Sequence, residues 1–240
     1  NNYSGDRNVC TSIYFLLTSE NFSAFQKKYN ISKEGNFEGS NILLENINQE
    51  LSEKETIKIK EIESLLINER KKRVKPFFDN KVQTDLNCYW LYSNLYASLI
   101  LDDNNLYSKT IFKINLINKK LKENIFHCYK KNKQEIDVFL EDYVYYALLL
   151  ISMYELNNDK ESLERCKKIM EDTWNLFFNK DYNLLQKNIS NSNDLFVNPV
   201  DIGDNNIPNG NSIYLLICSK LNNITNDQKW FKKLDILSKS

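Results

Sequence analysis

The chain has 240 residues, 42% of them hydrophobic, and its 32 basic side chains balance its 32 acidic side chains. This length is sufficient to bury a full core in one large domain or in two small ones. The formal net charge of zero excludes a field that attracts nucleic acid or anionic lipid. No apolar run approaches the roughly 20 residues of a membrane span. We therefore expect a protein that binds neither nucleic acid nor membrane.

The five cysteines are too few and too scattered for a disulfide framework. None of them forms a CxxC motif, and their odd number argues against complete pairing. Buried free thiols are typical of a reducing compartment. The sequence begins without methionine and without a basic segment followed by an apolar one, so we predict no signal peptide and a cytoplasmic location.

Residues 1–50 are mixed in character. The run at 10–18 is apolar and β-branched, which fits a strand or a buried turn of helix. A short helix is expected at about 19–30. Gly35 and Gly39 then indicate a tight, irregular loop. We predict an irregular N-terminal segment over residues 1–50, followed by a helical domain over residues 51–240.

From residue 51 onward the apolar residues recur with a helical period. Pro76 stops the first helix, and Thr84 is a good N-cap for the second. The segment near 125–135 is expected to be extended or turn-like, and 179–211 a long polar loop of the kind that is usually functional or disordered. The expected helices cover about 51–73, 85–101, 106–124, 139–156, 160–178, 212–221 and 226–237.

Short turns and the lack of strand–helix alternation predict an all-α fold, a series of antiparallel helical hairpins. Such a series forms a solenoid or a closed (α/α) toroid. The helix at 139–156 is hydrophobic on nearly all sides, so it should be buried against neighbours on both flanks.

Three places concentrate polar groups at expected helix ends. Asp79 and Lys81 form a charged turn, with Asn87 one turn into the next helix. Glu141 and Asp142 begin the most apolar helix. A third group precedes a later helix and comprises Asp204, Pro208, Asn209, Gly210, Asn211 and Ser212. If the hairpins present the same ends to one face, the three groups meet there.

Two of these groups also have structural interpretations. Glu141 and Asp142 favour the dipole of their helix and can cap it. Asn211 and Ser212 are ordinary N-cap residues, and Gly210 can supply a positive φ.

The charged turn has a similar alternative, because Asp79 can bond Lys81 or a backbone N–H. His127 is the only histidine, and its apolar surroundings favour a structural role over that of a base. A single histidine without a Cys/His cluster predicts no zinc site, and no phosphate-binding glycine motif is present. We predict no metal and no cofactor.

Four motifs in order resemble those of one known family. They are EGNFEGSNIL at 34–43, RKKRVKPFFDNK at 70–81, FLEDYVY at 139–145 and DNNIPNGNS at 204–212. The chain thereby resembles the thioredoxin-domain-containing proteins related to a human spermatogenesis-associated protein. The resemblance implies a thioredoxin-like domain followed by a six-hairpin glycosidase-like (α/α) toroid, similar to N-acylglucosamine epimerases.

The chain departs from that family at several positions. Leu86, Asn87 and Cys88 stand where the family has Trp-Asn-Gly, and Asn209 stands in place of a serine. A glycine pair is missing near 181–186, and the thioredoxin-like domain is absent. About seven expected helices fall short of twelve. We expect a fragment or a shortened, divergent member with an incomplete toroid.

Two functional hypotheses follow, and the sequence leaves open whether the protein is an enzyme. In the first, the toroid binds or acts on a sugar-like small molecule. Asp79, Glu141, Asp142 and Asp204 are then the catalytic candidates, and the candidates for binding substrate are Arg73, Lys81, Asn87, Tyr143, Asn211 and Ser212, with Trp90 a further candidate for stacking. In the second, the chain is a non-catalytic helical module that works with a thioredoxin-like domain.

Overall fold

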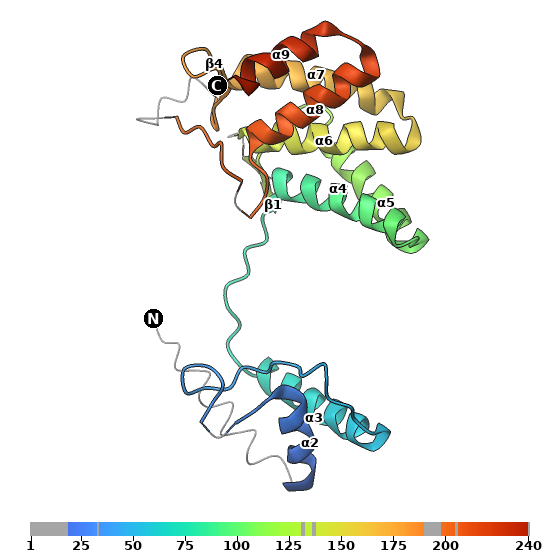
Figure 1. Cartoon of the computed structure of the whole chain (residues 1–240), viewed down its shortest axis with the longest axis vertical. Coiled ribbons are helices and arrows are strands. Elements are labelled where there is room, and N and C mark those ends of the chain that lie inside the picture. Colours follow the sequence, from blue (N-terminus) through green and yellow to red (C-terminus); the bar gives the residue numbers. More distant parts are fainter. Residues whose placement is uncertain are drawn as a thin grey trace. The chain divides into compact units, whose positions relative to one another are not determined.

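The structure is a computed structural model that describes residues 19–32, 34–130, 133–135, 138–189, 198–204 and 206–239. The chain forms two compact units, Asn1–Phe78 and Asp79–Ser240. Figure 1 shows the helices of each unit. The apolar run expected at 10–18 lies outside the described residues.

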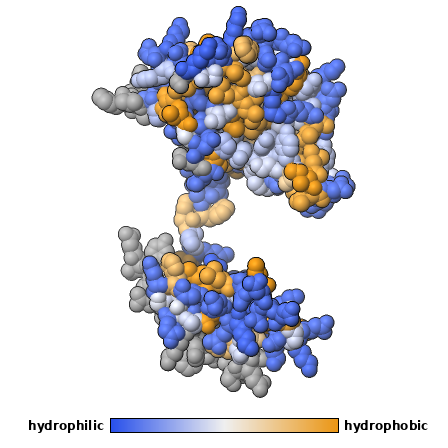
Figure 2. All heavy atoms as spheres, in the orientation of Figure 1, coloured by the Kyte–Doolittle hydropathy of each residue, from blue (hydrophilic) through white to orange (hydrophobic). Residues whose placement is uncertain are grey.

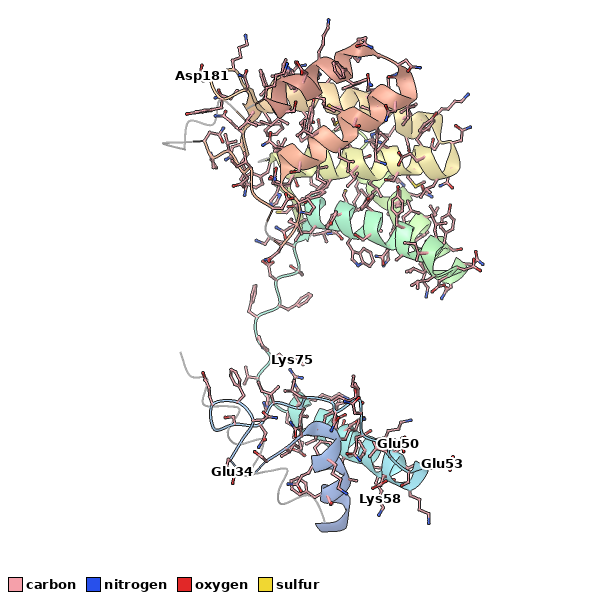
Figure 3. The ribbon with its side chains drawn as sticks, in the orientation of Figure 1. Glu34, Glu50, Glu53, Lys58, Lys75 and Asp181 are labelled. Carbon is pink, nitrogen blue, oxygen red and sulfur yellow. The ribbon has the colours of Figure 1, made fainter. Side chains whose placement is uncertain are left out.

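The described residues of the first unit form two helices, α2 (Ser19–Tyr29) and α3 (Glu53–Lys71). Phe25 of α2 packs with Ile59 and Ile62 of α3 in a small core. Charged side chains such as Glu53 and Lys58 project outward from α3 (Figure 3). The compact units divide between Phe78 and Asp79 and not after residue 50, the boundary predicted from the sequence, so α3 belongs with the first unit.

Local sequence signals explain the ends of α3 and the loop before it. Ser52 and Glu55 form a capping box, in which the Ser52 hydroxyl accepts from the Glu55 N–H and the Glu55 carboxylate accepts from the Ser52 N–H. Gly35 and Gly39 adopt φ values of 85° and 73°. A positive φ suits glycine, which has no Cβ, and the expected tight turn follows from it.

The second unit is an array of three helical hairpins. They are α4 (Thr84–Ile100) with α5 (Asn104–Lys120), α6 (Leu140–Asn157) with α7 (Lys160–Phe177), and α8 (Gly210–Thr225) with α9 (Gln228–Ser238). Helices α4 and α8 both pack against α6. The expected all-α, (α/α) toroid-like array of hairpins is confirmed.

The three hairpins turn in the same way. A residue with a positive φ follows the first helix of each hairpin. These residues are Asp102 after α4, Asn158 after α6 and Asn226 after α8. The next residue is in each case an aspartate, and its carboxylate accepts backbone N–H groups of the following helix. These N-caps are Asp103, Asp159 and Asp227. Asparagine and aspartate tolerate the left-handed conformation, and aspartate is a strong N-cap, so this dipeptide stops one helix and starts the next.

Helix α6 forms the centre of the core. Every residue from Val144 to Met153 is buried, as its apolar sequence predicts. Two buried hydroxyl groups on this helix are satisfied within the unit: that of Tyr146 donates to Asn118 of α5, and that of Ser152 donates to the Leu148 carbonyl. The four described cysteines, Cys88, Cys128, Cys166 and Cys218, are buried.

Short strands precede α4, α6 and α8, the first helices of the three hairpins. Strand β1 (Val82–Gln83) pairs antiparallel with β2 (Cys128–Lys130), which pairs with β3 (Lys133–Glu135), and β4 (Phe178–Asn179) pairs with β5 (Leu184–Leu185). The prediction that Thr84 caps α4 is wrong. Thr84 is already helical, and its hydroxyl donates to the Phe126 carbonyl at 2.6 Å because β1 holds this end of the helix against that segment.

The described helices contain no segment long and apolar enough to cross a membrane. Figure 2 shows an apolar patch at the turn of the α4/α5 hairpin, where Ile100 and Leu101 are 81% and 70% exposed. Elsewhere in this unit the view shows hydrophilic and hydrophobic residues side by side.

Candidate functional site

The N-termini of α4, α6 and α8 lie at the same end of the second unit (Figure 1). The backbone N–H of Asp85 in α4 donates to the Asp142 carboxylate of α6 at 3.2 Å. Gly210, the first residue of α8, lies so close to α6 that an added Cβ would be 2.6 Å from the Leu140 side chain. The three helix ends therefore meet, and the backbone N–H groups of this meeting point favour negative charge.

Asp142 links three segments at this end. Its carboxylate is fully buried and accepts from the Phe139 N–H at 2.9 Å, from the Asp85 N–H and from His127 Nδ1, which is 3.1 Å from both oxygens. Burial raises the pKa of Asp142 to about 6, against the opposing effect of the backbone bond and of His127. The Asp142 carboxylate therefore positions the helix ends. Its bond to the Phe139 N–H confirms the capping interpretation for Asp142.

His127 precedes β2 and points its Nδ1 at Asp142. Because a carboxylate only accepts, we assign the imidazole proton to Nδ1. The other nitrogen, Nε2, lies 3.4 Å from the amide nitrogen of Gln83 in β1 and is placed to accept from it. The ring packs edge-on against Phe139, with 4.7 Å between the centroids. This geometry agrees with the structural role that the sequence favoured.

Glu141 has a different environment from its neighbour. Its Oε2 atom is buried and has no hydrogen-bond partner among the described residues. Burial raises the pKa of Glu141, Lys187 opposes this, and Asp201 and Asp85 add to it. A carboxyl group in such surroundings holds a proton more readily than an ordinary glutamate.

The segment before α8 is held by its own polar side chains. Asp204 accepts from the backbone N–H and the side-chain amide of Asn209, at 2.9 and 2.8 Å. Asn209 in turn caps α8, because its Oδ1 accepts from the Ser212 N–H at 3.0 Å. The expectation that Asn211 or Ser212 is the N-cap is therefore wrong, since the helix begins earlier, at Gly210.

Gly210 and Asn211 have tertiary roles. Gly210 is not among the positive-φ glycines of the described chain, so its expected role in the backbone is also wrong; its missing Cβ makes room for Leu140. The Asn211 side chain accepts from the Leu185 N–H and donates to the carbonyls of Leu185 and Asp201, at 2.9, 2.9 and 3.1 Å. Asn211 thereby fastens β5 to α8.

The charged turn lies before β1. Asp79 pairs with Lys81 at 3.2 Å and also accepts from its backbone N–H, as the alternative interpretation predicted. Both side chains are exposed. Arg73 belongs to the first unit. The Asn87 side chain donates to the Gln83 carbonyl at 2.7 Å, so this amide braces the start of α4.

The two aromatic residues expected to stack on a ligand face neighbouring helices. The ring of Tyr143 packs against Phe177 of α7, with 5.4 Å between the centroids. The ring of Trp90 lies under the ammonium of Lys113 in α5, at 4.4 Å from the centroid. The Tyr143 contact joins α6 to α7, and the Trp90 contact joins α4 to α5.

Asp85 and His127 join Asp142 in a cluster that no pattern in the sequence predicted. One ligand atom from each lies within 4.8 Å of the others. Asp85 and Asp142 are 57 residues apart, and an aspartate in the first turn of a helix is commonplace, so the spacing carried no signal. Both Asp142 oxygens already accept N–H groups, which favours a hydrogen-bonded network over a cation site.

No protein-family model and no curated protein matches the chain. Several solved structures do. An inactive variant of the α-1,6-mannanase GH76A of Salegentibacter sp. HEL1_6, in complex with an α-1,6-mannotetraose, is 15% identical, with a TM-score of 0.50 over 78% of this chain and 53% of that chain. A GH76 α-mannanase of Bacteroides thetaiotaomicron is 10% identical, with a TM-score of 0.49 over 88% and 63%. The chain thus spans about half the length of the Salegentibacter enzyme and shares its (α/α) helical-hairpin fold.

Proposed function

We propose that the unit Asp79–Ser240 binds and acts on a carbohydrate-type small molecule where α4, α6 and α8 begin. The carboxyl of Glu141 carries this proposal. It combines a raised pKa with a buried oxygen that no described residue satisfies. A polar atom in that state is costly in a scaffold and useful in a site.

The chemistry that suits this group is proton transfer. A carboxyl whose pKa is raised by burial holds a proton that it can donate to a glycosidic oxygen, or exchange at an epimerisable carbon. Asp85 supplies a second carboxylate at the same helix ends. Two carboxyl groups in unlike environments are the usual requirement for breaking a glycosidic bond. Asp142 positions both through its bonds to the Asp85 and Phe139 N–H groups.

The fold and the sequence motifs support this assignment. The inactive variant of the Salegentibacter mannanase carries replacements of two consecutive aspartates, and Glu141 and Asp142 are likewise consecutive acidic residues. The four motifs favour the thioredoxin-domain-containing family for this chain. Asp79 and Asp204 then stay predicted catalytic candidates, and Lys81, Asn87, Asn211 and Ser212 stay predicted ligand contacts.

The test compares two single amide variants. We would incubate the full chain with α-1,6-mannotriose, measure binding by calorimetry and detect products by mass spectrometry. Glu141→Gln should abolish turnover and retain binding, because the amide keeps the shape and loses the proton. Asp142→Asn should weaken both. Asp181→Asn, on the exposed β4–β5 turn, is the control. Equal activity of wild type and Glu141→Gln on every sugar that binds would remove the proposal.

A second candidate function rests on how the motif residues are used. Asp79 pairs with Lys81, and Asp204 with Asn209, so these polar groups serve the scaffold. We propose as the alternative a non-catalytic helical module that works with a thioredoxin-like domain. Co-purification with such a domain, without turnover of any sugar, would favour it. The failure of a tagged chain to retain a thioredoxin-like protein would count against it.

A further inference from the structure

A row of tyrosines runs along α4. Tyr89, Tyr92 and Tyr96 are spaced three and four residues apart, which places them on one face of the helix. Their ring centroids are 6.0 Å apart between Tyr89 and Tyr92, with nearly parallel planes, and 4.9 Å apart between Tyr92 and Tyr96. Tyr145 of α6 adjoins the first ring at 4.9 Å. The four rings therefore form one continuous aromatic row, which is buried at Tyr145 and partly exposed at Tyr89, Tyr92 and Tyr96.

This row begins at the proposed site. Tyr145 follows Glu141 by one helical turn. Burial raises the pKa of the Tyr145 hydroxyl, and Tyr89 and the charge on Glu141 raise it further. Along α4 the row extends for about 10 Å between Tyr89 and Tyr96, at the helical rise per residue. Its far end carries polar groups, because the Tyr96 hydroxyl donates to Glu155 at 3.3 Å.

The far end is electrically balanced. Glu155 also accepts from Lys220 of α8 at 2.7 Å, so the carboxylate and the ammonium neutralise each other. Burial raises the pKa of Tyr92, with further increases from Tyr96 and Glu155 and a decrease from Lys220. The phenol is consequently neutral, and the row presents hydroxyl groups and ring faces rather than net charge.

The hydroxyl groups of the row distinguish it from core packing. Among the described residues of this unit, the three fully buried tyrosines all donate: Tyr145 to the Pro208 carbonyl, Tyr146 to Asn118 and Tyr214 to the Met170 carbonyl. Tyr89 and Tyr92 are only partly buried, and their hydroxyls bond to no described residue. Core tyrosines usually find such a partner. Two neighbouring phenols without one, on a partly exposed aromatic face, are suited to an external polar ligand.

We propose that Tyr89, Tyr92 and Tyr96 form an extended binding surface for the pyranose rings of a neutral oligosaccharide whose reacting unit lies at Glu141. The inference rests on the proposed function and names its substrate class. A pyranose has an apolar C–H face that matches the negative face of an aromatic ring, and hydroxyls that match the phenols and the Glu155–Lys220 pair. A row of three rings favours a chain of sugars over a single one.

The test measures affinity as a function of sugar length. The full chain would be titrated calorimetrically with α-1,6-mannobiose and α-1,6-mannotetraose. Tyr92→Leu should weaken tetraose binding by about tenfold and leave biose binding unchanged, because one stacking contact is lost only for the longer sugar. Tyr92→Phe, which keeps the ring, should stay close to wild type. Tyr107→Leu on α5, whose hydroxyl donates to Asn157, is the matched control.

The outcomes separate the two proposals. Tetraose binding that Tyr92→Leu leaves intact, or weakens no more than biose binding, would overturn the stacking surface and leave the role of Glu141 standing. Loss of turnover in Glu141→Gln, together with tetraose binding that Tyr92→Leu weakens more than biose binding, would support both. Absence of binding of either sugar to the wild-type chain would overturn both. Thermal melts of each variant, matched to wild type, would show that the affinities refer to folded protein.

Discussion

The Asp142 carboxylate accepts from His127 Nδ1, with both of its oxygens 3.1 Å from that nitrogen. This contact joins the segment before β2 to the first turn of α6. The same carboxylate accepts backbone N–H groups of Phe139 and Asp85, so one fully buried side chain fixes the relative positions of β2, α4 and α6. The geometry of the proposed site depends on it.

Replacement of Asp142 by alanine should destabilise the second unit strongly. The change leaves two backbone N–H groups and the His127 N–H without an acceptor in a buried place, at a cost of about 3 kcal/mol. Chemical denaturation would measure it. Asp181→Ala is the control: Asp181 projects from the exposed β4–β5 turn (Figure 3), and its replacement should change the free energy of unfolding by less than about 0.5 kcal/mol. Equal effects of the two variants would contradict the linking role of Asp142.

Glu141→Gln should stabilise the protein at neutral pH, by about 1 kcal/mol. Because burial raises its pKa, the folded state binds the Glu141 proton more tightly than the unfolded state does. The stability contributed by the protonated form is therefore full below the unfolded pKa of glutamate and declines as pH rises through the raised pKa of the folded state. Glutamine has no such dependence.

The measurement is the difference in unfolding free energy between Glu141→Gln and wild type from pH 4 to pH 8. This difference in unfolding free energy should grow as the pH rises through the lower part of this range. A difference that is constant with pH would show that Glu141 is ordinarily ionised in the folded protein, and it would weaken its assignment as a proton donor.

Gly210→Ala should destabilise the contact between α6 and α8. The new Cβ would lie 2.6 and 2.7 Å from two carbons of Leu140, so either the leucine or the helix must move, at a cost of about 1–3 kcal/mol. Gly203→Ala is the matched control, because nothing lies within 4 Å of its added Cβ. Thermal unfolding should separate the two variants clearly, and a wild-type melt for Gly210→Ala would refute this close approach.

Asn209 is predicted to be replaceable by serine and not by alanine. Asn209 caps α8 through the Ser212 N–H, and serine caps a helix about as well, so Asn209→Ser should change stability by less than about 0.5 kcal/mol. Asn209→Ala should cost about 1 kcal/mol. The resembled family has a serine at this position, so the two residues would then be alternative caps of one helix. A larger loss in the serine variant would point instead to the Asn209–Asp204 bonds.

Local patterns predicted the helices well. The apolar period located α3 to α9, and the turn predicted at 102–105 includes Asp102 and Asp103, which separate α4 from α5. Where a helix start was predicted wrongly, at Thr84 and at Ser212, a tertiary contact had extended it. Thr84 bonds to Phe126, which lies 42 residues away, and Asn211 bonds to Leu185, which lies 26 residues away.

The amino-acid sequence by itself determined the all-α class, the hairpin order and the acidic start of α6, because helical periods, caps and turns act over a few residues. Only the tertiary structure decided that Asp142 is a buried link, that Glu141 carries the unsatisfied oxygen, and that Asp85 and His127 belong with them. Glu141 and Asp142 are adjacent carboxylates of the same chemical type, so the sequence alone does not distinguish their roles. The neighbours that distinguish them come from α4, β2 and α8, and their positions follow from packing against α6 rather than from any local pattern.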